Sequence, residues 1–509
     1  MTLLDIKNLS VEFQKDSGRK RVVDSVSFQM APGEILGIVG ESGSGKSTLM
    51  YTLKGLLWER AAVSYDKLEM MDNIKIGMVL QYPLSYLTPG MKVGTQLMET
   101  IRQHQHLSKQ EAKQEALSLL EQVGIEGGEK ILHKYPHAFS GGMRQRIILA
   151  IALAMNPSLL IADEPTTALD VLVQRKILKR IRKIARERNM AVLLVSHDLC
   201  VVGELAKRVI VMKEGQIVED APIEKIFSSP DHPYTQMLLE RFHSEQLKQN
   251  EEEETEVLLS VEHLQKSFAE GGIFRKEKVT RAVRDVSLTI CRGETYGLVG
   301  ESGCGKTTLA RILTGIVRPD EGVIDYYGEK RMQMVFQDSY AALDPRLTLY
   351  QILEEPLKLN HIGTAEERRN KIQEMIQWIG LPPDAMNKRP HAFSGGELQR
   401  ICIARALILD PELIILDEPV AALDVVTQEQ ILELLVRIQE EKDITYLFIS
   451  HDLHLVKRMC RRISVMYQGE FVESGDTAKI YENPQHSYTK TLLNAALLRK
   501  TGHKIHVHE

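Results

Sequence analysis

Residues 40–47 read Gly-Glu-Ser-Gly-Ser-Gly-Lys-Ser, and residues 300–307 read Gly-Glu-Ser-Gly-Cys-Gly-Lys-Thr. Both stretches match Gly-x-x-x-x-Gly-Lys-[Ser/Thr], and each follows a short apolar run that is typical of a β-strand. The glycines let the backbone turn until successive N–H groups point at one anion, and the helix that begins at the lysine adds the positive end of its dipole. Each stretch therefore predicts a loop that binds the phosphates of a nucleotide. Two intact copies argue against a chance match.

The expected contacts in these loops come from glycines, small hydroxyl residues and the lysine. Lys46 and Lys306 are predicted to reach the β- and γ-phosphates, while Ser47 and Thr307 offer a hydroxyl to Mg²⁺. The expected nucleotide-binding residues of the loops are Gly40, Ser42, Gly43, Gly45, Lys46, Ser47, Thr48, Gly300, Ser302, Gly303, Gly305, Lys306, Thr307 and Thr308.

Length and composition limit the class of protein. The chain has 509 residues, which suits two or three domains, and its 64 basic and 69 acidic side chains give no overall attraction to nucleic acid. Five scattered cysteines without a Cys-x-x-Cys pair indicate a reducing compartment. No signal peptide is expected, and the longest apolar run, residues 147–155, is well short of the ~20 residues that span a bilayer. If the protein acts at a membrane, another chain must cross it.

A tandem repeat decides the domain organisation. The phosphate loop, a glutamine after an apolar strand, a Ser-Gly-Gly triplet, an Asp-Glu-Pro triplet and a histidine after a strand recur in the same order 254 to 260 residues later. Residues 244–256 are polar and acidic with little to bury, so they are predicted to form a linker. We therefore predict two homologous domains, residues 1–243 and 257–509.

Each half also carries local signals for strands and helices. Alternating apolar and polar residues at Leu4–Phe13 and Leu259–Phe268 predict the first strand of a pair. Capping boxes at Ser108–Glu111 and Thr364–Glu367 predict the starts of core helices.

A Ser-Gly-Gly triplet opens a strongly periodic helix in each half. Two glycines behind a capping serine expose the first N–H groups of a helix, as a γ-phosphate requires, although such a triplet alone is most often an ordinary N-cap. The residues concerned are Ser140, Gly141, Gly142, Ser394, Gly395 and Gly396.

Adjacent carboxylates end an apolar strand about twenty residues after each triplet. Ionised side chains at the buried end of a strand are costly unless a cation compensates them, and Mg²⁺ would do so. His197 and His451 then follow another strand, at the carboxyl end where open α/β sheets bind ligands. A single histidine there is more often structural, but the doubled placement favours a functional role.

Together with Ala-Leu-Asp at residues 168–170 and 422–424, these motifs resemble the ATP-binding-cassette (ABC) ATPases over nearly the whole chain, twice. The resemblance implies an α/β fold of two tandem P-loop NTPase cassettes, each with a RecA-like core sheet, an antiparallel β-subdomain and a helical subdomain. It implies ATP and Mg²⁺ as cofactors. It also implies two ATP sites, each joining the phosphate loop of one cassette to the Ser-Gly-Gly of the other, so that the fused cassettes replace a heterodimer.

The family's residue roles are carried over to matching positions. Each Mg²⁺ site is expected to use a hydroxyl, a glutamine and an aspartate, namely Ser47, Gln81 and Asp163, and Thr307, Gln337 and Asp417. Each catalytic set is expected to pair a glutamate that polarises water with a histidine that contacts the γ-phosphate, namely Glu164 with His197, and Glu418 with His451. Phe13 and Phe268 are candidates for stacking on adenine, although an aromatic residue at a strand end is at least as often in the core.

Within the family, the resemblance is strongest to the ATPases of peptide and nickel importers. The residues that carry it are 139–146, 337–345, His-Pro-Tyr-Thr at 232–235 and His-Ser-Tyr-Thr at 486–489. It implies a hydrolase at the cytoplasmic face of the cell membrane that powers import. The implied partners are two transmembrane permease subunits, which dock beside the glutamine loops, and through them a substrate-binding protein.

Three alternatives stay open at this point. Di- or oligopeptides are the expected substrates, with nickel or a metal chelate as the alternative. A soluble tandem cassette acting on ribosomes or nucleic acid is disfavoured by the short acidic linker, and also because Met-Arg-Gln or Glu-Leu-Gln follows Ser-Gly-Gly. A nucleotide-binding scaffold without turnover is the third reading. Shorter spans between the lysine and the glutamine than in these relatives predict a trimmed β-subdomain.

Overall fold

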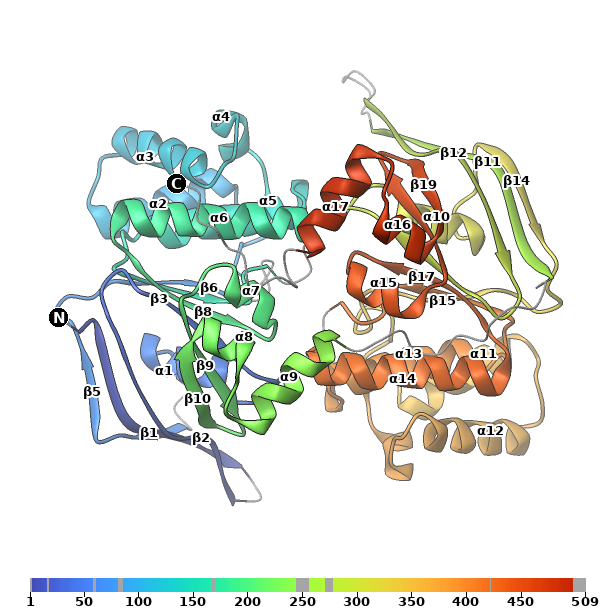
Figure 1. The fold of residues 1–509 in the computed structure, drawn as a ribbon, viewed down its shortest axis with the longest axis horizontal. Helices are drawn as coiled ribbons and strands as arrows, with labels where there is room; N and C mark the ends of the chain where they lie inside the picture. The colour runs from blue at the N-terminus through green and yellow to red at the C-terminus, as the bar shows by residue number, and fades with distance from the viewer. Residues whose placement is uncertain are drawn as a thin grey trace. The chain divides into compact units, whose positions relative to one another are not determined.

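The structure is a computed structural model that describes residues 2–15, 18–57, 61–80, 86–166, 170–243, 256–270, 278–421 and 423–497. The chain divides into two compact units, one containing Met1–His243 and the other Ser244–Ala496 (Figure 1). We call them unit 1 and unit 2. Residues 244–255 of the predicted linker lie outside the described residues.

The core of unit 1 is a six-stranded sheet of order β10-β9-β3-β8-β7-β6. All of its pairs are parallel except β9 with β10. The strands are nearly continuous apolar runs, as expected where both faces of a parallel sheet are covered. Their bounds are β3 Ile35–Val39, β6 Ile76–Val79, β7 Leu159–Asp163, β8 Ala191–Ser196, β9 Arg208–Lys213 and β10 Gln216–Pro222.

An antiparallel sheet forms the second layer of unit 1. β1 (Leu4–Lys15) pairs with β2 (Gly18–Met30) along one edge and with β4 (Ala61–Ser64) and β5 (Lys67–Met70) along the other. Leu36, Ile38 and Leu193 point from the core sheet to this layer and to α1 (Lys46–Lys54), where they are fully buried. The predicted helix start at Lys46 is confirmed.

Helices cover the other face of the core sheet. Val39, Ala162 and Leu194 alternate with the residues of the first face and pack in the helical core. The helices of unit 1 after α1 are α2 Val93–Gln105, α3 Lys109–Gln122, α4 Gly128–Leu132, α5 Gly141–Leu153, α6 Val171–Arg188, α7 Leu199–Gly203, α8 Ile223–Ser228 and α9 Pro233–His243, with the short η2 Pro136–Ala138. In Figure 1, α2, α3, α5 and α6 lie on the opposite side of the core sheet from β1, β2 and β5.

Unit 2 repeats this architecture. Its core sheet has the order β15-β16-β17-β13-β18-β19, and its antiparallel sheet has the order β12-β11-β14, with one described strand where unit 1 has β4 and β5. The bounds are β11 Val257–Glu270, β12 Lys278–Cys291, β13 Thr295–Val299, β14 Glu321–Tyr326, β15 Gln333–Val335, β16 Leu413–Asp417, β17 Thr445–Ser450, β18 Arg462–Tyr467 and β19 Glu470–Asp476. The predicted α/β architecture is confirmed in both halves.

The helices of unit 2 follow the same order as those of unit 1. Both predicted capping boxes are present, at Ser108 before α3 and at Thr364 before α12. No helix of the described ranges is long and apolar enough to cross a membrane. The helix bounds are α10 Lys306–Leu313, α11 Leu349–Leu359, α12 Ala365–Trp378, η3 Pro383–Asn387, η4 Pro390–Ala392, α13 Gly395–Leu407, α14 Val425–Lys442, α15 Leu453–Met459, α16 Thr477–Glu482 and α17 Ser487–Leu497.

Candidate functional site

Each phosphate loop connects the central strand of a core sheet to the helix beneath it. Gly45 has φ 96°, and a Cβ there would lie 2.6 Å from the carbonyl oxygen of Val22. Gly305 has φ 118°, and a Cβ there would lie 2.2 Å from the carbonyl oxygen of Ala282. Any side chain at these positions would require a left-handed backbone and would overlap the antiparallel sheet. The loop conformation therefore depends on glycine at these two positions.

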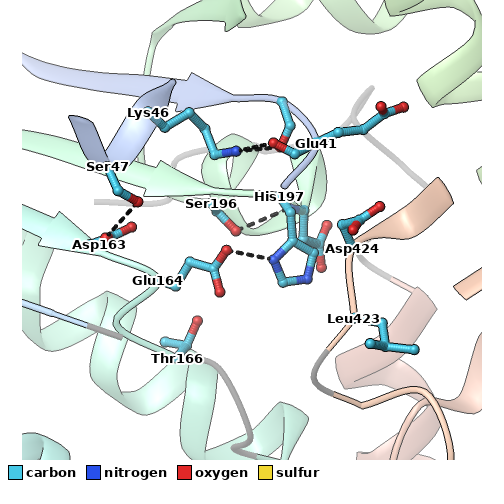
Figure 2. Close-up of polar contacts among 12 residues, drawn as sticks. Glu41, Lys46, Ser47, Asp163, Glu164, Thr166, Ser196, His197, Leu423 and Asp424 are labelled. Atoms are coloured by element: carbon cyan, nitrogen blue, oxygen red, sulfur yellow. Dashed lines mark hydrogen bonds and ion pairs between the residues drawn. The ribbon is translucent and has the colours of Figure 1, made fainter. Parts of the chain in front are cut away.

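The loop lysines are buried and curl back into their own loops. Nζ of Lys46 donates to the carbonyl oxygens of Gly40 at 2.7 Å and Glu41 at 2.6 Å, and to Oγ of Ser44 at 3.1 Å (Figure 2). Lys306 makes the same bonds to Gly300 and Glu301, and Sγ of Cys304 replaces the serine oxygen at 3.7 Å. The ammonium group is thus fixed inside the curve of each loop.

A buried aspartate lies beside each loop at the end of a core strand. Oγ of Ser47 donates to Oδ2 of Asp163 at 3.3 Å. Burial raises the pKa of Asp163 to about 7, and the charge of Glu164 adds to this, while Lys46 and the Ser47 hydroxyl oppose it. Hydroxyl and carboxylate oxygens are donors that suit Mg²⁺, and a divalent cation would relieve the unfavourable burial of the carboxylate. The residues present therefore fit the metal.

In unit 2 the aspartate has the same surroundings. Burial raises the pKa of Asp417 above its ordinary value, while the Thr307 hydroxyl and the charge of Lys306 oppose the rise and the charge of Glu418 adds to it.

The glutamate after each aspartate has an unusual backbone. Glu164 has φ 46° and Glu418 has φ 50°, a left-handed conformation that few residues other than glycine adopt. Their N–H groups donate to the carbonyl oxygens of Val195 at 2.8 Å and Ile449 at 2.9 Å, on the neighbouring strands. Strained backbone of this kind gathers at functional sites, and here it turns the carboxylate out of the line of the strand.

His197 faces Glu164 across the end of the sheet (Figure 2). Its Nδ1 lies 2.9 Å from Oε1 of Glu164. Burial would lower the pKa of His197, but the hydrogen bond and charge of Glu164, with the charge of Asp198, outweigh it and raise the pKa. Contact with Glu164 therefore favours the charged form of the imidazole, against the effect of burial.

In unit 2 a third side chain joins the pair. Nδ1 of His451 lies 3.0 Å from Oε1 of Glu418, an ion-pair contact whose direction is not that of a regular hydrogen bond. Nε2 of Gln337 donates to Oε2 of Glu418 at 2.6 Å. Burial alone would raise the pKa of Glu418, but His451, Lys306 and Gln337 together bring it below its ordinary value. Gln81, the equivalent of Gln337 in unit 1, lies outside the described residues.

The Ser-Gly-Gly triplets form the N-termini of α5 and α13, as predicted. Ser140 and Ser394 are exposed N-cap residues, and Glu397 completes a capping box with Ser394, whereas Ser140 has no side-chain capping bond. Among the residues that the structure describes, no hydrogen bond joins either serine to the loop, carboxylates or histidine of its own unit.

The remaining predicted residues have mixed positions. Ser42, Gly43, Ser302 and Gly303 are exposed in their loops, and Thr48 and Thr308 lie half-buried in the first turns of α1 and α10. Phe13 is partly buried and packs against the core, which agrees with the alternative that it is a core aromatic residue. Phe268 is 41% exposed, with Nζ of Lys266 5.6 Å from its ring centre.

Sequence reasoning missed the serines that precede the histidines. Oγ of Ser196 accepts from the N–H of Asp198 at 3.0 Å, and Ser450 bonds Asp452 in the same way. Each aspartate in turn caps the short helix that follows it. These bonds fix the turn that presents the histidine, and the repeated Ser-His-Asp triplet was the available signal.

Comparison with known proteins gives two family matches. Residues 23–167 and 283–421 match the ABC transporter family model. Residues 218–270 and 472–506 match the C-terminal region of oligopeptide/dipeptide transporters. Each half of the chain thus carries both regions in the same order.

Individual relatives cover almost the whole chain. It is 38% identical to the glutathione import ATP-binding protein GsiA of Pectobacterium atrosepticum and 39% identical to that of Escherichia coli K12, in each case over 97% of this chain and 89% of the relative. Among solved structures, an archaeal ribosome recycling factor in complex with a ribosomal stalk protein has 25% identity and a TM-score of 0.59. That match covers 86% of this chain and 84% of the other.

Proposed function

The chain belongs to the ABC transporter family as two fused cassettes, and on this premise we propose that it is the ATP-hydrolysing subunit of an importer of short peptides. One observation carries the proposal: a match to the ABC transporter family followed by a match to the oligopeptide/dipeptide transporter C-terminal region occurs twice along the chain. Below, cassette 1 is the cassette of unit 1 and cassette 2 that of unit 2.

The relatives support import over action on ribosomes. Import ATP-binding proteins share 38–39% of residues over nearly the whole chain, and glutathione, which they import, is a tripeptide. The likeness to a ribosome recycling factor is lower in identity, and a shared tandem fold is enough to account for it. The family match and the relatives of the chain support peptides over nickel.

ATP is held by the two phosphate loops. Loop N–H groups and the helix dipole bind the phosphate oxygens, and Lys46 and Lys306 exchange their carbonyl partners for the β- and γ-phosphates. Bound Mg²⁺ supplies neutralisation of the phosphate charge. The residues that would hold it are Ser47, Gln81 and Asp163 in cassette 1, and Thr307, Gln337 and Asp417 in cassette 2.

Hydrolysis uses the glutamate and histidine of each cassette. Glu164 and Glu418 accept a hydrogen bond from the attacking water, because their left-handed backbone directs the carboxylate away from the buried strand. His197 and His451 contact the γ-phosphate, and their elevated pKa favours the charged form that stabilises the transferring group.

The Ser-Gly-Gly triplets complete the sites across the cassette pair, as the family resemblance implies. Ser394, Gly395 and Gly396 grip the nucleotide of cassette 1, and Ser140, Gly141 and Gly142 grip that of cassette 2. The position of the triplets supports this assignment, because each opens a helix whose N-terminal dipole favours an anion and Ser140 and Ser394 are exposed at the N-caps.

The work of transport is done by other chains. Two permease subunits cross the membrane and receive the motion of the cassettes, and a substrate-binding protein delivers the peptide to them. The chain acts at the cytoplasmic face of the membrane. Its lack of a candidate membrane-spanning helix in the described ranges is compatible with a peripheral position.

The test is reconstitution with candidate permease subunits of a peptide importer. We expect the full-length chain to co-purify with them in detergent, and the complex in vesicles to take up labelled glutathione or dipeptide in proportion to ATP hydrolysed. Uptake of nickel but no peptide would contradict the substrate. Co-sedimentation with ribosomes in place of permease would contradict the function.

A further inference from the structure

We propose that Tyr234 and Tyr488, in the C-terminal region of the two cassettes, are positioning residues that hold the phosphate loops in shape and thereby set the affinity for ATP. The inference rests on the ATP-binding role proposed above. It gives a physical task to the region that matches the oligopeptide/dipeptide transporter C-terminal model.

Tyr234 reaches the loop from the start of α9. Its side chain is only 4% exposed, and its hydroxyl accepts a hydrogen bond of 3.1 Å from the N–H of Glu41. Glu41 is the second residue of the phosphate loop and lies 193 positions away in the sequence. A residue from the far end of the cassette therefore contacts the loop directly.

Glu41 is also bonded by Lys46, the lysine of the phosphate loop. The carbonyl oxygen of Glu41 accepts a bond of 2.6 Å from Nζ of Lys46, while its N–H donates to Tyr234 (Figure 2 shows the lysine contact). The tyrosine and the lysine are thus linked through one residue. A displacement of the tyrosine would move the acceptor on which the lysine rests.

Hydrogen bonds from Glu219 and His232 fix the backbone around Tyr234. The two carboxylate oxygens of Glu219 accept from the N–H groups of Asp231 at 2.9 Å and His232 at 3.2 Å. Nδ1 of His232 then accepts from the N–H of Tyr234 at 3.1 Å, and Nζ of Lys213 lies 5.1 Å from the tyrosine ring centre. Glu219 is 8% exposed, so the carboxylate that accepts both bonds is shielded from water. Glu219 lies on β10, so these hydrogen bonds attach the segment before Tyr234 to the core sheet.

Cassette 2 repeats the connection with different neighbours. The hydroxyl of Tyr488 accepts from the N–H of Glu301 at 3.0 Å, and the carbonyl oxygen of Glu301 accepts from Lys306 at 2.9 Å. Glu473 accepts from the N–H groups of residues 485 and 486 at 2.8 and 3.0 Å, and Nδ1 of His486 accepts from that of Tyr488 at 3.2 Å. Ser487 and Tyr467 stand where cassette 1 has Pro233 and Lys213.

The bonds to the loop are therefore kept although the residues around them differ. In cassette 2 the ring of Tyr467 packs on Tyr488 with centres 4.3 Å apart, in place of the lysine over Tyr234. The ring of each tyrosine is thus contacted by a different side chain, whereas its hydroxyl makes the same bond to the loop. The same contact in two cassettes whose surrounding residues differ favours a role at the loop over a chance contact of a core tyrosine.

The expected effect is on binding and not on the chemical step. A glycine-rich loop loses much conformational freedom when it orders around phosphate, and a fixed acceptor on its outer side reduces that loss. Each tyrosine hydroxyl bonds the backbone of the phosphate loop itself, at the N–H of Glu41 or of Glu301. Removing the hydroxyls should thus weaken ATP binding and raise KM while kcat changes little.

The test uses the full-length chain with Tyr234→Phe and Tyr488→Phe combined, which deletes two oxygens and leaves the rings. We expect the dissociation constant for ATP and the KM for hydrolysis to rise about three- to tenfold, the equivalent of one lost hydrogen bond per site, with kcat within about twofold. The matched control is Tyr481→Phe, whose hydroxyl donates to the carbonyl oxygen of Leu453 in the same C-terminal region. It should leave both constants unchanged.

Melting curves distinguish positioning from simple support of the fold. We expect little change in the melting temperature without nucleotide and a smaller rise on adding ATP. Unchanged dissociation constant and KM would overturn the inference, as would a lower melting temperature with an unchanged rise on ATP. If the variant does not fold, Glu219→Gln with Glu473→Gln provides a second test, because it weakens the hydrogen bonds that fix the segments before the two tyrosines. This variant should raise the dissociation constant for ATP. An unchanged dissociation constant would overturn the inference. A wild-type chain that neither binds nor hydrolyses ATP would instead contradict the proposed function.

Discussion

Oε1 of Glu164 lies 2.9 Å from Nδ1 of His197, at the carboxyl ends of the adjacent strands β7 and β8. The same atoms of Glu418 and His451 lie 3.0 Å apart between β16 and β17. In both cassettes the glutamate has a left-handed backbone that a bond to the neighbouring strand fixes. Each carboxylate is therefore fixed by its own backbone and by the histidine.

Replacing both histidines should separate hydrolysis from binding. In the His197→Ala and His451→Ala double variant we expect phosphate release to fall about 100-fold, because a charged donor to the transferring phosphoryl group and the partner of the glutamate are both lost. ATP affinity should change little, since the phosphate loops are intact. Phosphate release and ATP titration on the same preparation measure the two quantities.

The control for the histidine variants is His263→Ala. His263 also pairs with a carboxylate, through Nδ1 and Oδ1 of Asp285 at 2.6 Å, but on the exposed antiparallel sheet. It should leave hydrolysis unchanged. Equal losses in both experiments would mean that the histidines only support the fold.

Gly45→Ala tests the geometry of the phosphate loop. The new Cβ would need a left-handed backbone and would lie 2.6 Å from the Val22 carbonyl oxygen, so we expect a stability loss of about 1–3 kcal/mol and a loss of ATP binding. Denaturant unfolding and ATP titration measure both. Gly90→Ala, where a Cβ meets nothing within 4 Å, is the control and should bind ATP like the wild type. An alanine at position 45 without effect would refute the loop geometry.

Asp163→Asn with Asp417→Asn tests the metal role. Both carboxylates are buried with an elevated pKa, so removing their charge should not lower, and above neutral pH should raise, the melting temperature without nucleotide. In the wild type, ATP with Mg²⁺ should stabilise more than ATP with EDTA. We expect this difference to disappear in the variant, as measured by thermal melting in the four conditions.

Asp320→Asn is the matched control, because Asp320 pairs with Lys266 at the surface of the antiparallel sheet. Its difference between Mg²⁺ and EDTA should equal that of the wild type. A difference that persists in Asp163→Asn with Asp417→Asn would show that the metal is held elsewhere.

Glu294→Gln tests whether Glu294 makes the stability of the fold depend on pH. Burial raises the pKa of Glu294 above its ordinary 4.5, and the N–H of Cys291 with the charges of Arg462 and Arg461 offsets only part of the rise. The folded chain then binds this proton more tightly than the unfolded chain, so its contribution to stability is present below about pH 4.5 and is lost as pH rises through the folded pKa. Compared with the wild type, the variant should gain in melting temperature as pH rises above about pH 4.5. A difference that stays constant with pH would contradict this.

Local patterns were enough to predict much of the fold. The phosphate loops, the helix at Lys46 and the capping boxes at Ser108 and Thr364 depend on residues within a few positions of one another, and each is present as expected. The buried strands β7 and β8 were visible as continuous apolar runs.

Other features depend on contacts that no local pattern contains. The left-handed backbone of Glu164 is fixed by the carbonyl oxygen of Val195 on another strand. Tyr234 finds Glu41 only when the end of the cassette folds back on its beginning. The repeated His-x-Tyr-Thr was visible, but its target in the loop was not. Cooperation between the two Ser-Gly-Gly triplets and the opposite loops stays a prediction.

The most direct test of the account replaces both catalytic glutamates, as Glu164→Gln with Glu418→Gln, and measures phosphate release together with ATP binding. Glutamine keeps the size of the side chain but cannot accept the developing proton of the attacking water. We expect that ATP still binds and that phosphate release falls by about 100-fold or more from the wild-type rate. Release at the wild-type rate by a variant that binds ATP would show that these carboxylates do not carry the hydrolysis.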